Sequence, residues 1–186
     1  MAVIEKEFTH SQQKIFLQYL LVKLEIQLKF LAIQKKLNNC VNGNNDGPVI
    51  QSQSVGTIVT FGYGNRKDYD SFLHYLQLFE VKSVVDVRLN PRAWSRKWYG
   101  DSIAKFCELH NIEYSSQLAL GNTSGSKHWI PPEDQDVKNS LLDVAEMLKK
   151  GSVLLLCAEM DSERCHRTEV AEKLQSLTQS PIEHLR

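Results

Sequence analysis

The residues best suited to chemistry lie together near the carboxyl end of the chain, in the segment 157–167. This segment combines two thiols, an imidazole, carboxylates and two guanidinium groups. Its last four residues are expected to open a helix, whose free N–H groups and dipole favour anions and thiolates. The candidate site residues of the segment are Cys157, Glu159, Arg164, Cys165, His166 and Arg167.

Three kinds of site fit this segment. In the first, Cys157 or Cys165 is a nucleophile that His166 and the helix terminus activate. In the second, these three residues bind a metal ion, although the seven-residue gap and the lack of a second cysteine pair are unlike a structural zinc site. In the third, the arginines bind an anion and the cysteines only pack. A phosphate loop of the C-x5-R type needs arginine six residues after cysteine, whereas Arg164 follows Cys157 by seven. We therefore predict neither a metal ion nor a cofactor.

An acidic and a basic residue stand at the end of a valine-rich run, residues 84–87. A carboxylate at Asp86 would be largely desolvated there, so a cationic partner is expected. Arg88 points to the same face two residues later. Asp86 and Glu159 are the candidates for proton transfer, and Arg88 is a candidate anion ligand. Structural pairing and catalysis both stay open for Asp86.

Two further segments could bind phosphate or nucleic acid. Gly62, Tyr63, Gly64 and Asn65 follow a predicted strand and could bring backbone N–H groups to an anion. They lack the third glycine of a dinucleotide fingerprint and the lysine of a P-loop, so a nicotinamide cofactor is not supported. Residues 88–105 carry five cations against one acid, a net charge of +4, and include Arg92, Trp94 and Trp98. Basic and aromatic side chains in one loop are typical of proteins that bind single-stranded nucleic acid.

The elements that must position these residues alternate between short apolar strands and amphipathic helices. We expect strands at residues 56–61, 84–87, 112–114, 153–156 and 182–185, and helices at 68–79, 102–110, 137–149 and 167–177. Continuous apolar strands separated by helices are typical of a parallel sheet covered on both faces. The predicted fold class is therefore α/β, doubly wound, with about five mostly parallel strands. Ligands of such sheets bind beyond the carboxyl ends of the strands, where the candidate residues lie.

The amino-terminal part of the chain has a different pattern. Leucines at heptad-like spacing between Leu17 and Leu31 predict a long amphipathic helix within residues 1–40. Residues 41–54, rich in asparagine and glycine, are expected to be a flexible linker before an α/β domain at 55–186. Because a lone helix cannot hide such an apolar face, a homodimer formed through this helix is one candidate assembly.

Composition limits the classes of function. The 186 residues carry 22 basic and 22 acidic side chains. This balance argues against coating nucleic acid by bulk charge, though not against a local basic patch. Four cysteines are too few for a disulfide scaffold. The most apolar stretch, residues 15–33, is interrupted by Lys23, Glu25 and Lys29, unlike a membrane span. We expect a cytoplasmic protein with no membrane partner.

Taken together, the motifs resemble an uncharacterised family of bacterial and archaeal proteins, domain of unknown function family 488. The resemblance covers roughly residues 56–186 and implies a single α/β domain with no established activity. Phe61 and Asn122 depart from it, since a smaller aliphatic residue and a second glycine are usual at those two positions. The motifs that carry it are residues 60–65, 85–88 with Pro91, 120–121, 156–159 and 165–167.

The leading functional hypothesis from the sequence is an enzyme that acts on a phosphate-bearing substrate, such as a nucleotide or a nucleic-acid component. Arg88, Arg164 and Arg167 would hold the anion, and Cys165 with His166 would supply the nucleophile. Two alternatives stay open. One is a non-catalytic nucleic-acid-binding module that uses the basic and aromatic loop, and the other is a sulfur-transfer-like thiol enzyme. The sequence thus leaves open whether the chain is an enzyme.

Overall fold

The structure, a computed structural model, describes residues 56–185. The strands are β1 (Ile58–Gly62), β2 (Val81–Asp86), β3 (Glu113–Ser116), β4 (Ser152–Cys157) and β5 (Ile182–His184), and the α-helices are α2 (Asp70–Leu78), α3 (Gly100–Leu109), α4 (Asp134–Lys150) and α5 (Arg167–Thr178). Short 3-10 helices cover Arg96–Trp98, Leu118–Leu120 and Ser162–Arg164. The expected amino-terminal helix and linker lie outside the described residues, so the division at residues 40 and 54 stays a prediction. No helix of the described part is long and apolar enough to cross a membrane.

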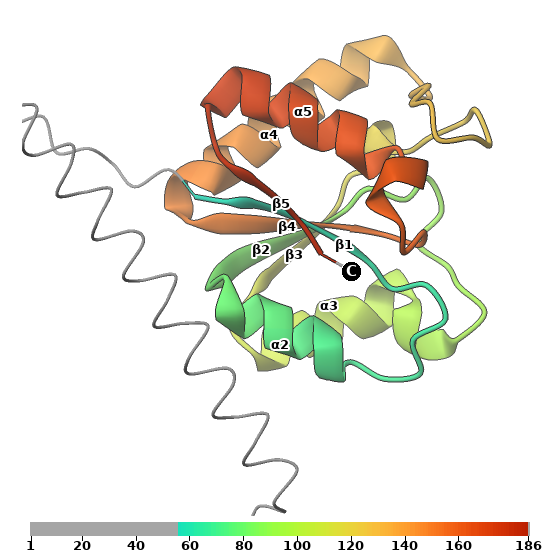
Figure 1. Cartoon of the computed structure of the whole chain (residues 1–186), viewed down its shortest axis with the longest axis vertical. Coiled ribbons are helices and arrows are strands. Elements are labelled where there is room, and N and C mark those ends of the chain that lie inside the picture. Colours follow the sequence, from blue (N-terminus) through green and yellow to red (C-terminus); the bar gives the residue numbers. More distant parts are fainter. Residues whose placement is uncertain (1–55, 186) are drawn as a thin grey trace, which may run out of the picture. The chain divides into compact units, whose positions relative to one another are not determined.

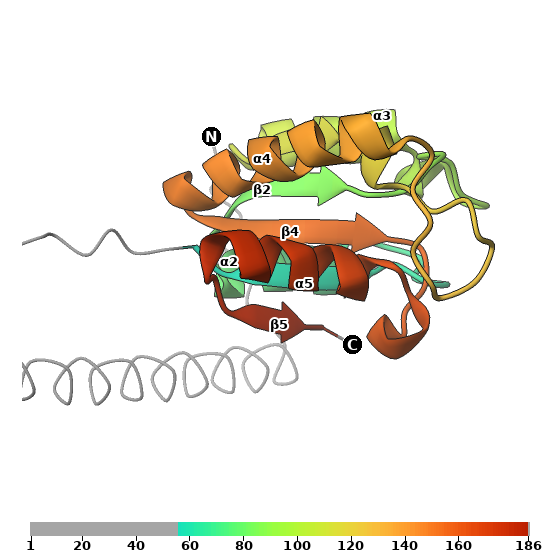
Figure 2. The same ribbon diagram turned by 90° about the horizontal axis from the view of Figure 1, so that it is seen from above.

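The five strands form one parallel sheet in the order β3-β2-β4-β1-β5. Helices α2 and α3 cover one face of this sheet, and α4 and α5 cover the other (Figures 1 and 2). The α/β fold class and its doubly wound parallel sheet are therefore confirmed. The strands that pair directly are mostly distant in sequence, because each strand-helix-strand connection crosses over to a new position.

Each face of the sheet has its own apolar core, because neighbouring side chains along a strand point to opposite sides. On the α2 and α3 side, Phe61 and Leu156 pack with Phe72 of α2 and Ile103 of α3. On the other side the strand residues pack against α4 and α5. Residues 153–156 have no exposed area, which explains why this strand is apolar throughout rather than alternating.

Strand β4 lies at the centre of the sheet, between β1 and β2. The chain leaves β4 towards one face of the sheet and leaves β1 and β2 towards the other face. After β1 and β2 the chain continues to α2 and α3 on one face, whereas after β4 it continues to α5 on the other face. Adjacent strands that diverge in this way leave a crevice at their carboxyl ends, and this is where ligands bind in open α/β sheets. The pairing of Gly62 with Cys157 and of Asp86 with Leu156 brings the three strand ends to the same level.

Candidate functional site

Two cysteines and a histidine meet where β4 ends and α5 begins. Cys157 is the last residue of β4, and Cys165 and His166 immediately precede α5. The two Sγ atoms and one ring nitrogen of His166 all lie within 4.8 Å of one another. Their exposed fractions are only 6%, 5% and 8%. We call Cys157, Cys165, His166 and Arg167 the thiol cluster.

The loop between the two cysteines folds back on itself, which is why residues eight apart in sequence come together. The Asp161 carboxylate accepts the N–H of Glu163 at 3.0 Å and starts the 3-10 helix Ser162–Arg164. The Thr168 hydroxyl then donates to the Ser162 carbonyl at 2.6 Å, tying the first turn of α5 to this loop. The reversed loop places Cys165 beside the end of β4.

The imidazole of His166 is held in one orientation. Its Nε2 lies 2.9 Å from the carbonyl oxygen of Val87, just after β2. A carbonyl can only accept a hydrogen bond, so Nε2 carries a proton. The other nitrogen, Nδ1, lies 4.0 Å from Sγ of Cys165. In the neutral ring Nδ1 is therefore an acceptor that faces the thiol, and in the protonated ring it is a donor that faces a thiolate.

Arg167 places a cation inside the same cluster. The side chain has no exposed area. Its Nη1 donates to the carbonyl of Glu159, and its Nη2 donates to the carbonyl of Met160 at 2.9 Å, while its Nε has no hydrogen-bond partner among residues 56–185. These carbonyls carry no formal charge, and a buried guanidinium favours an anion nearby. The thiol cluster therefore combines a positive charge with an unused N–H donor.

The surroundings shift the pKa values of the two thiols in opposite directions. The pKa of Cys165 is lowered, first by a hydrogen bond from the Cys157 thiol, and then, against the effect of burial, by His166 and by the charge and backbone N–H of Arg167. The pKa of Cys157 is raised well above its ordinary value by its hydrogen bond to Cys165 and by burial. The contacts within the pair therefore favour the thiol form at Cys157 and the thiolate form at Cys165.

A second cluster surrounds the buried carboxylate of Asp86. Its Oδ1 accepts hydrogen bonds from Nε of Arg88 at 2.7 Å and from the Arg88 backbone at 3.2 Å. Its Oδ2 accepts from Nη2 of Arg88 and, at 2.9 Å, from the Tyr114 hydroxyl. Nη1 of Arg88 donates to the Trp98 carbonyl at 2.8 Å. Both carboxylate oxygens and the guanidinium are thus engaged within the protein.

The carboxylate of Asp86 and the guanidinium of Arg88 stabilise each other's charged form. Burial alone would lower the pKa of Arg88, but the hydrogen bonds and charge of Asp86 raise it above the ordinary value. Burial and the charge of Asp86 likewise raise the pKa of Tyr114. Each of these groups has a hydrogen-bond partner within the protein, as a buried ion pair requires.

The glycine loop after β1 is bonded to the loop after β4. The N–H of Tyr63 donates to the Cys157 carbonyl at 3.1 Å, and the N–H of Gly64 donates to the Ala158 carbonyl at 2.8 Å. A Cβ atom on Gly62 would stand 1.8 Å from the carbonyl oxygen of Glu159, so only glycine allows this approach. These two N–H groups bond the loop after β1 to the chain at residues 157 and 158, so they are not directed at an anion.

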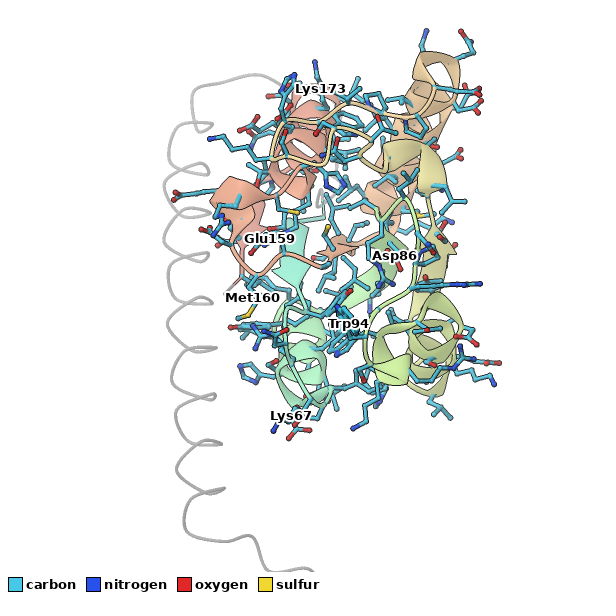
Figure 3. All side chains as sticks on the ribbon, turned by 90° about the vertical axis from the view of Figure 1, so that its right-hand side faces the viewer. Lys67, Asp86, Trp94, Glu159, Met160 and Lys173 are labelled. Atoms are coloured by element: carbon cyan, nitrogen blue, oxygen red, sulfur yellow. The ribbon has the colours of Figure 1, made fainter. Side chains whose placement is uncertain are left out.

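Figure 3 looks onto this edge and labels two of the candidates, Asp86 and Glu159. The exposed side chain of Glu159 accepts the N–H of Asp161 at 3.1 Å. Asn65, Arg92 and Arg164 are exposed as well. Of the residues predicted from the sequence, the structure brings Cys157, Cys165 and His166 within 4.8 Å of one another, places the charge of Arg167 where it acts on both thiols, and pairs Asp86 with Arg88. The other candidates do not converge on the thiol cluster.

Sequence reasoning missed two members of the second cluster. Tyr114 reaches Asp86 because β3 lies beside β2, and Trp98 contributes only a main-chain carbonyl. Neither residue belongs to a sequence motif that would indicate its contact with the Asp86 cluster. The one hint in the sequence is that Tyr114 stands between polar residues, Glu113 and Ser115, in a short predicted strand, so that its ring needs a specific partner.

Comparison with known proteins gives one match. Residues 68–174, more than half of the chain, match the family described as domain of unknown function DUF488. The resemblance noted in the motifs is thus confirmed over this range. Searches of curated proteins and of solved structures found no match.

Proposed function

We propose that this chain, which belongs to the DUF488 family, is a thiol enzyme in which Cys165 is the nucleophile of a sulfur-transfer reaction. One observation carries the proposal: Sγ of a second cysteine, Cys157, lies within 4.8 Å of Sγ of Cys165. A lone thiolate would serve phosphoryl or acyl transfer equally well. A neighbouring sulfur is an advantage specifically for chemistry in which sulfur–sulfur bonds form and break.

The lowered pKa of Cys165 suits both halves of such a reaction. A thiolate that is ionised at neutral pH can attack, and a thiolate of low pKa also departs readily when an acceptor takes the transferred atom. His166 and the buried Arg167 stabilise the sulfur anion each time it forms. These residues are the ones that the fold brings to the carboxyl end of the central strand.

The burial of the cluster restricts the substrate. Only 5% of Cys165 is exposed, so the atom under attack must be terminal and unhindered. The outer sulfur of a persulfide or a thiosulfonate meets this requirement. The phosphate-bearing substrate expected from the sequence is less well supported, because Arg88 and Arg167 direct their Nη donors at groups of the protein itself.

With thiosulfate as the probe donor, the reaction balances as follows. The Cys165 thiolate attacks the outer sulfur, a new sulfur–sulfur bond forms at Sγ, and sulfite leaves with the electron pair of the broken bond. Cyanide, as the probe acceptor, then takes the outer sulfur as thiocyanate, and Cys165 leaves as thiolate again. The Cys157 proton stays in place to stabilise that thiolate.

The test is intact-mass measurement of the full chain after incubation with thiosulfate. The expected result is the gain of one sulfur atom, which cyanide removes. Cys165→Ser should abolish the gain, and Cys157→Ser should slow thiocyanate formation. Cys107→Ala, which changes a thiol buried between α3 and the sheet, should leave it unaltered.

Three results would overturn the proposal. One is that no sulfur is gained, and another is that Cys165→Ser gains as much as the unaltered chain. The third concerns metal: the candidate ligand atoms of Cys157, Cys165 and His166 are close enough to share an ion. Tightly held zinc, lost on Cys157→Ser, would assign the three residues to a metal site instead. Hydrolysis of p-nitrophenyl phosphate that depends on Cys165 would restore the phosphate hypothesis.

A further inference from the structure

A pocket separate from the thiol cluster opens between the loop after β1 and the loop after β2. Its volume is about 270 Å³, slightly below the roughly 300–1,000 Å³ of most small-molecule sites. Aromatic rings and two cations dominate its lining, which consists of Tyr63, Gly64, Asn65, Arg66, Lys67, Trp94, Ser95 and Trp98. In Figure 3, Lys67 and Trp94 lie on this part of the carboxyl edge.

Trp94 is fully exposed at the mouth of this pocket. Its exposed fraction is 108%, so neighbouring groups cover essentially none of the indole. Tryptophan is highly buried on average in folded proteins, because of its large apolar surface. A free indole face at the entrance of a pocket is the arrangement that stacks on a flat, aromatic ligand.

The inner wall of the pocket is rigid and also aromatic. The rings of Tyr63 and Trp98 stack with their centroids 4.9 Å apart and their planes within 12°. The indole N–H of Trp98 donates to the carbonyl of Arg66 at 2.9 Å, which joins the wall to the loop after β1. A ring that enters between Trp94 and this wall therefore meets a preformed aromatic surface on its inner side.

The cations around the pocket match a phosphate backbone. Arg66 and Lys67 line the pocket. Arg92, Arg96 and Lys97 follow in the adjacent loop, where residues 88–100 contain no acidic side chain, although Arg92 and Arg96 line a neighbouring hollow with Asp101, to which Arg96 is ion-paired. Lys97 donates to the carbonyl of Lys67 at 3.0 Å, so the two basic loops are joined. The side chains of Lys67 and Arg92 are exposed and can reach a ligand outside the pocket.

We propose that this pocket binds single-stranded nucleic acid, with one base stacked on Trp94 and the flanking phosphates held by Lys67 and Arg92. The pocket has room for one base, and in a duplex the base faces are already stacked on one another, which favours a single strand. Stacking does not depend on which base is present, so binding is expected to tolerate sequence. This function uses a surface that the sulfur-transfer site does not share.

The test is fluorescence anisotropy of the full chain with labelled oligothymidylate, oligouridylate and a duplex of equal length. Both single strands should bind more tightly than the duplex, and comparing them assigns the partner to DNA or RNA. Trp94→Ala should weaken binding about 5- to 150-fold, the value expected for the loss of one base stack. Trp94→Phe should restore part of the affinity. Leu142→Ala, an exposed apolar residue of α4, is the matched control and should have no effect.

Salt dependence tests the phosphate contacts separately. For a single strand, each contact that is lost should reduce the slope of log affinity against log salt concentration by roughly 0.7. Lys67→Gln should show this reduction, and Lys173→Gln should not, since Lys173 lies on α5 at the opposite end of the view in Figure 3 from Lys67. The proposal is overturned if single strands do not bind, if the duplex binds equally well, or if Trp94→Ala binds like the unaltered chain. Sulfur uptake by Cys165 is independent of each of these outcomes.

Discussion

Alkylation of native Cys165 by iodoacetamide is expected to proceed at a rate that hardly changes between about pH 5.5 and pH 8. Thiolates react with iodoacetamide and thiols do not, so the rate of an ordinary cysteine rises about tenfold per pH unit below its pKa of about 8.5. In the folded protein the thiol of Cys157, the imidazole of His166 and the charge and N–H of Arg167 keep Cys165 ionised over this whole range.

The absolute rate at one pH would not test this reasoning. At pH 6 an ordinary thiol is ionised to roughly 0.3%, whereas the pKa of Cys165, lowered to about 4, leaves it ionised throughout. Ionisation thus favours Cys165 roughly 300-fold. A thiolate of lower pKa is also less nucleophilic, and a Brønsted coefficient of about 0.4–0.5 over this difference in pKa costs roughly 60- to 180-fold. Because the two effects nearly cancel, the pH profile carries the information.

The assay follows labelling by mass spectrometry after tryptic digestion. Cleavage after Lys150, Arg164 and Arg167 places Cys157 and Cys165 in different peptides. Cys107 is the internal control, since burial raises its pKa to about 12 and its label should be absent from the native protein. The same chain in urea gives the profile of Cys165 as an ordinary thiol.

A native profile that rises as steeply as the profile in urea would refute the proposed thiolate. Complete protection of native Cys165 at every pH would count equally against it, because a nucleophile must be within reach of its substrate. His166→Gln separates the contributions: if the imidazole helps to hold the thiolate, the profile of this variant becomes steeper. An unchanged profile would leave Arg167 and Cys157 as the groups that lower the pKa.

Stability measurements test the surrounding contacts. Asp86→Asn should lower the free energy of unfolding in urea by about 3–5 kcal/mol, because it leaves a buried guanidinium unpaired, whereas Asp101→Asn in an exposed pair should cost at most about 1 kcal/mol. Equal losses would contradict the assignment of a buried pair. Gly62→Ala should lower the free energy of unfolding by at least the upper part of about 1–3 kcal/mol, because the new Cβ would overlap a main-chain carbonyl. Gly125→Ala should lower it by about 1–2 kcal/mol, because its Cβ has open space but the residue has a positive φ. A larger loss for Gly125→Ala than for Gly62→Ala in urea denaturation would argue against the loop packing. The advantage in melting temperature of the unaltered chain over Cys165→Ala should shrink as the pH falls from 8 towards 5. Folding lowers the pKa of Cys165, so the contribution of its thiolate to stability is fully present above the ordinary thiol pKa. This contribution is lost as the pH falls towards the pKa in the folded protein. A difference that stays constant with pH would contradict a folded-state thiolate.

Most elements could be predicted from the sequence because their apolar patterns are strong. The run at residues 153–156 predicts the central strand, and the structure extends it by one residue at each end. Several boundaries were less accurate, among them those of the second and third strands. The second strand begins at Val81, three residues earlier than predicted, because Glu80 turns the chain with a φ of 50° although it is not glycine. The third strand runs to Ser116, and its polar, half-exposed residues give no hydrophobic signal.

The site was predictable in location and less so in geometry. The carboxyl edge follows from the alternation of strands and helices, so the neighbourhood of Cys157, Cys165 and Asp86 could be anticipated. The order of the strands could not, and it is this order that brings Tyr114 to Asp86 and the Val87 carbonyl to His166. Sequence spacing also understated the closeness of the two cysteines, since a 3-10 turn reverses the loop between them.

The central position of β4 has a consequence for how the protein matures. This strand is the fourth of the five strands in residues 56–185, yet it pairs with both β1 and β2, and two of the residues that lower the pKa of Cys165, His166 and Arg167, follow it still later. Such long-range pairing forms only after most of the chain is present. During synthesis Cys165 therefore lacks the surroundings that lower its pKa until α5 docks, so the proposed nucleophile would form only in a finished domain. The aromatic pocket, built from residues 63–98, is complete in sequence much earlier.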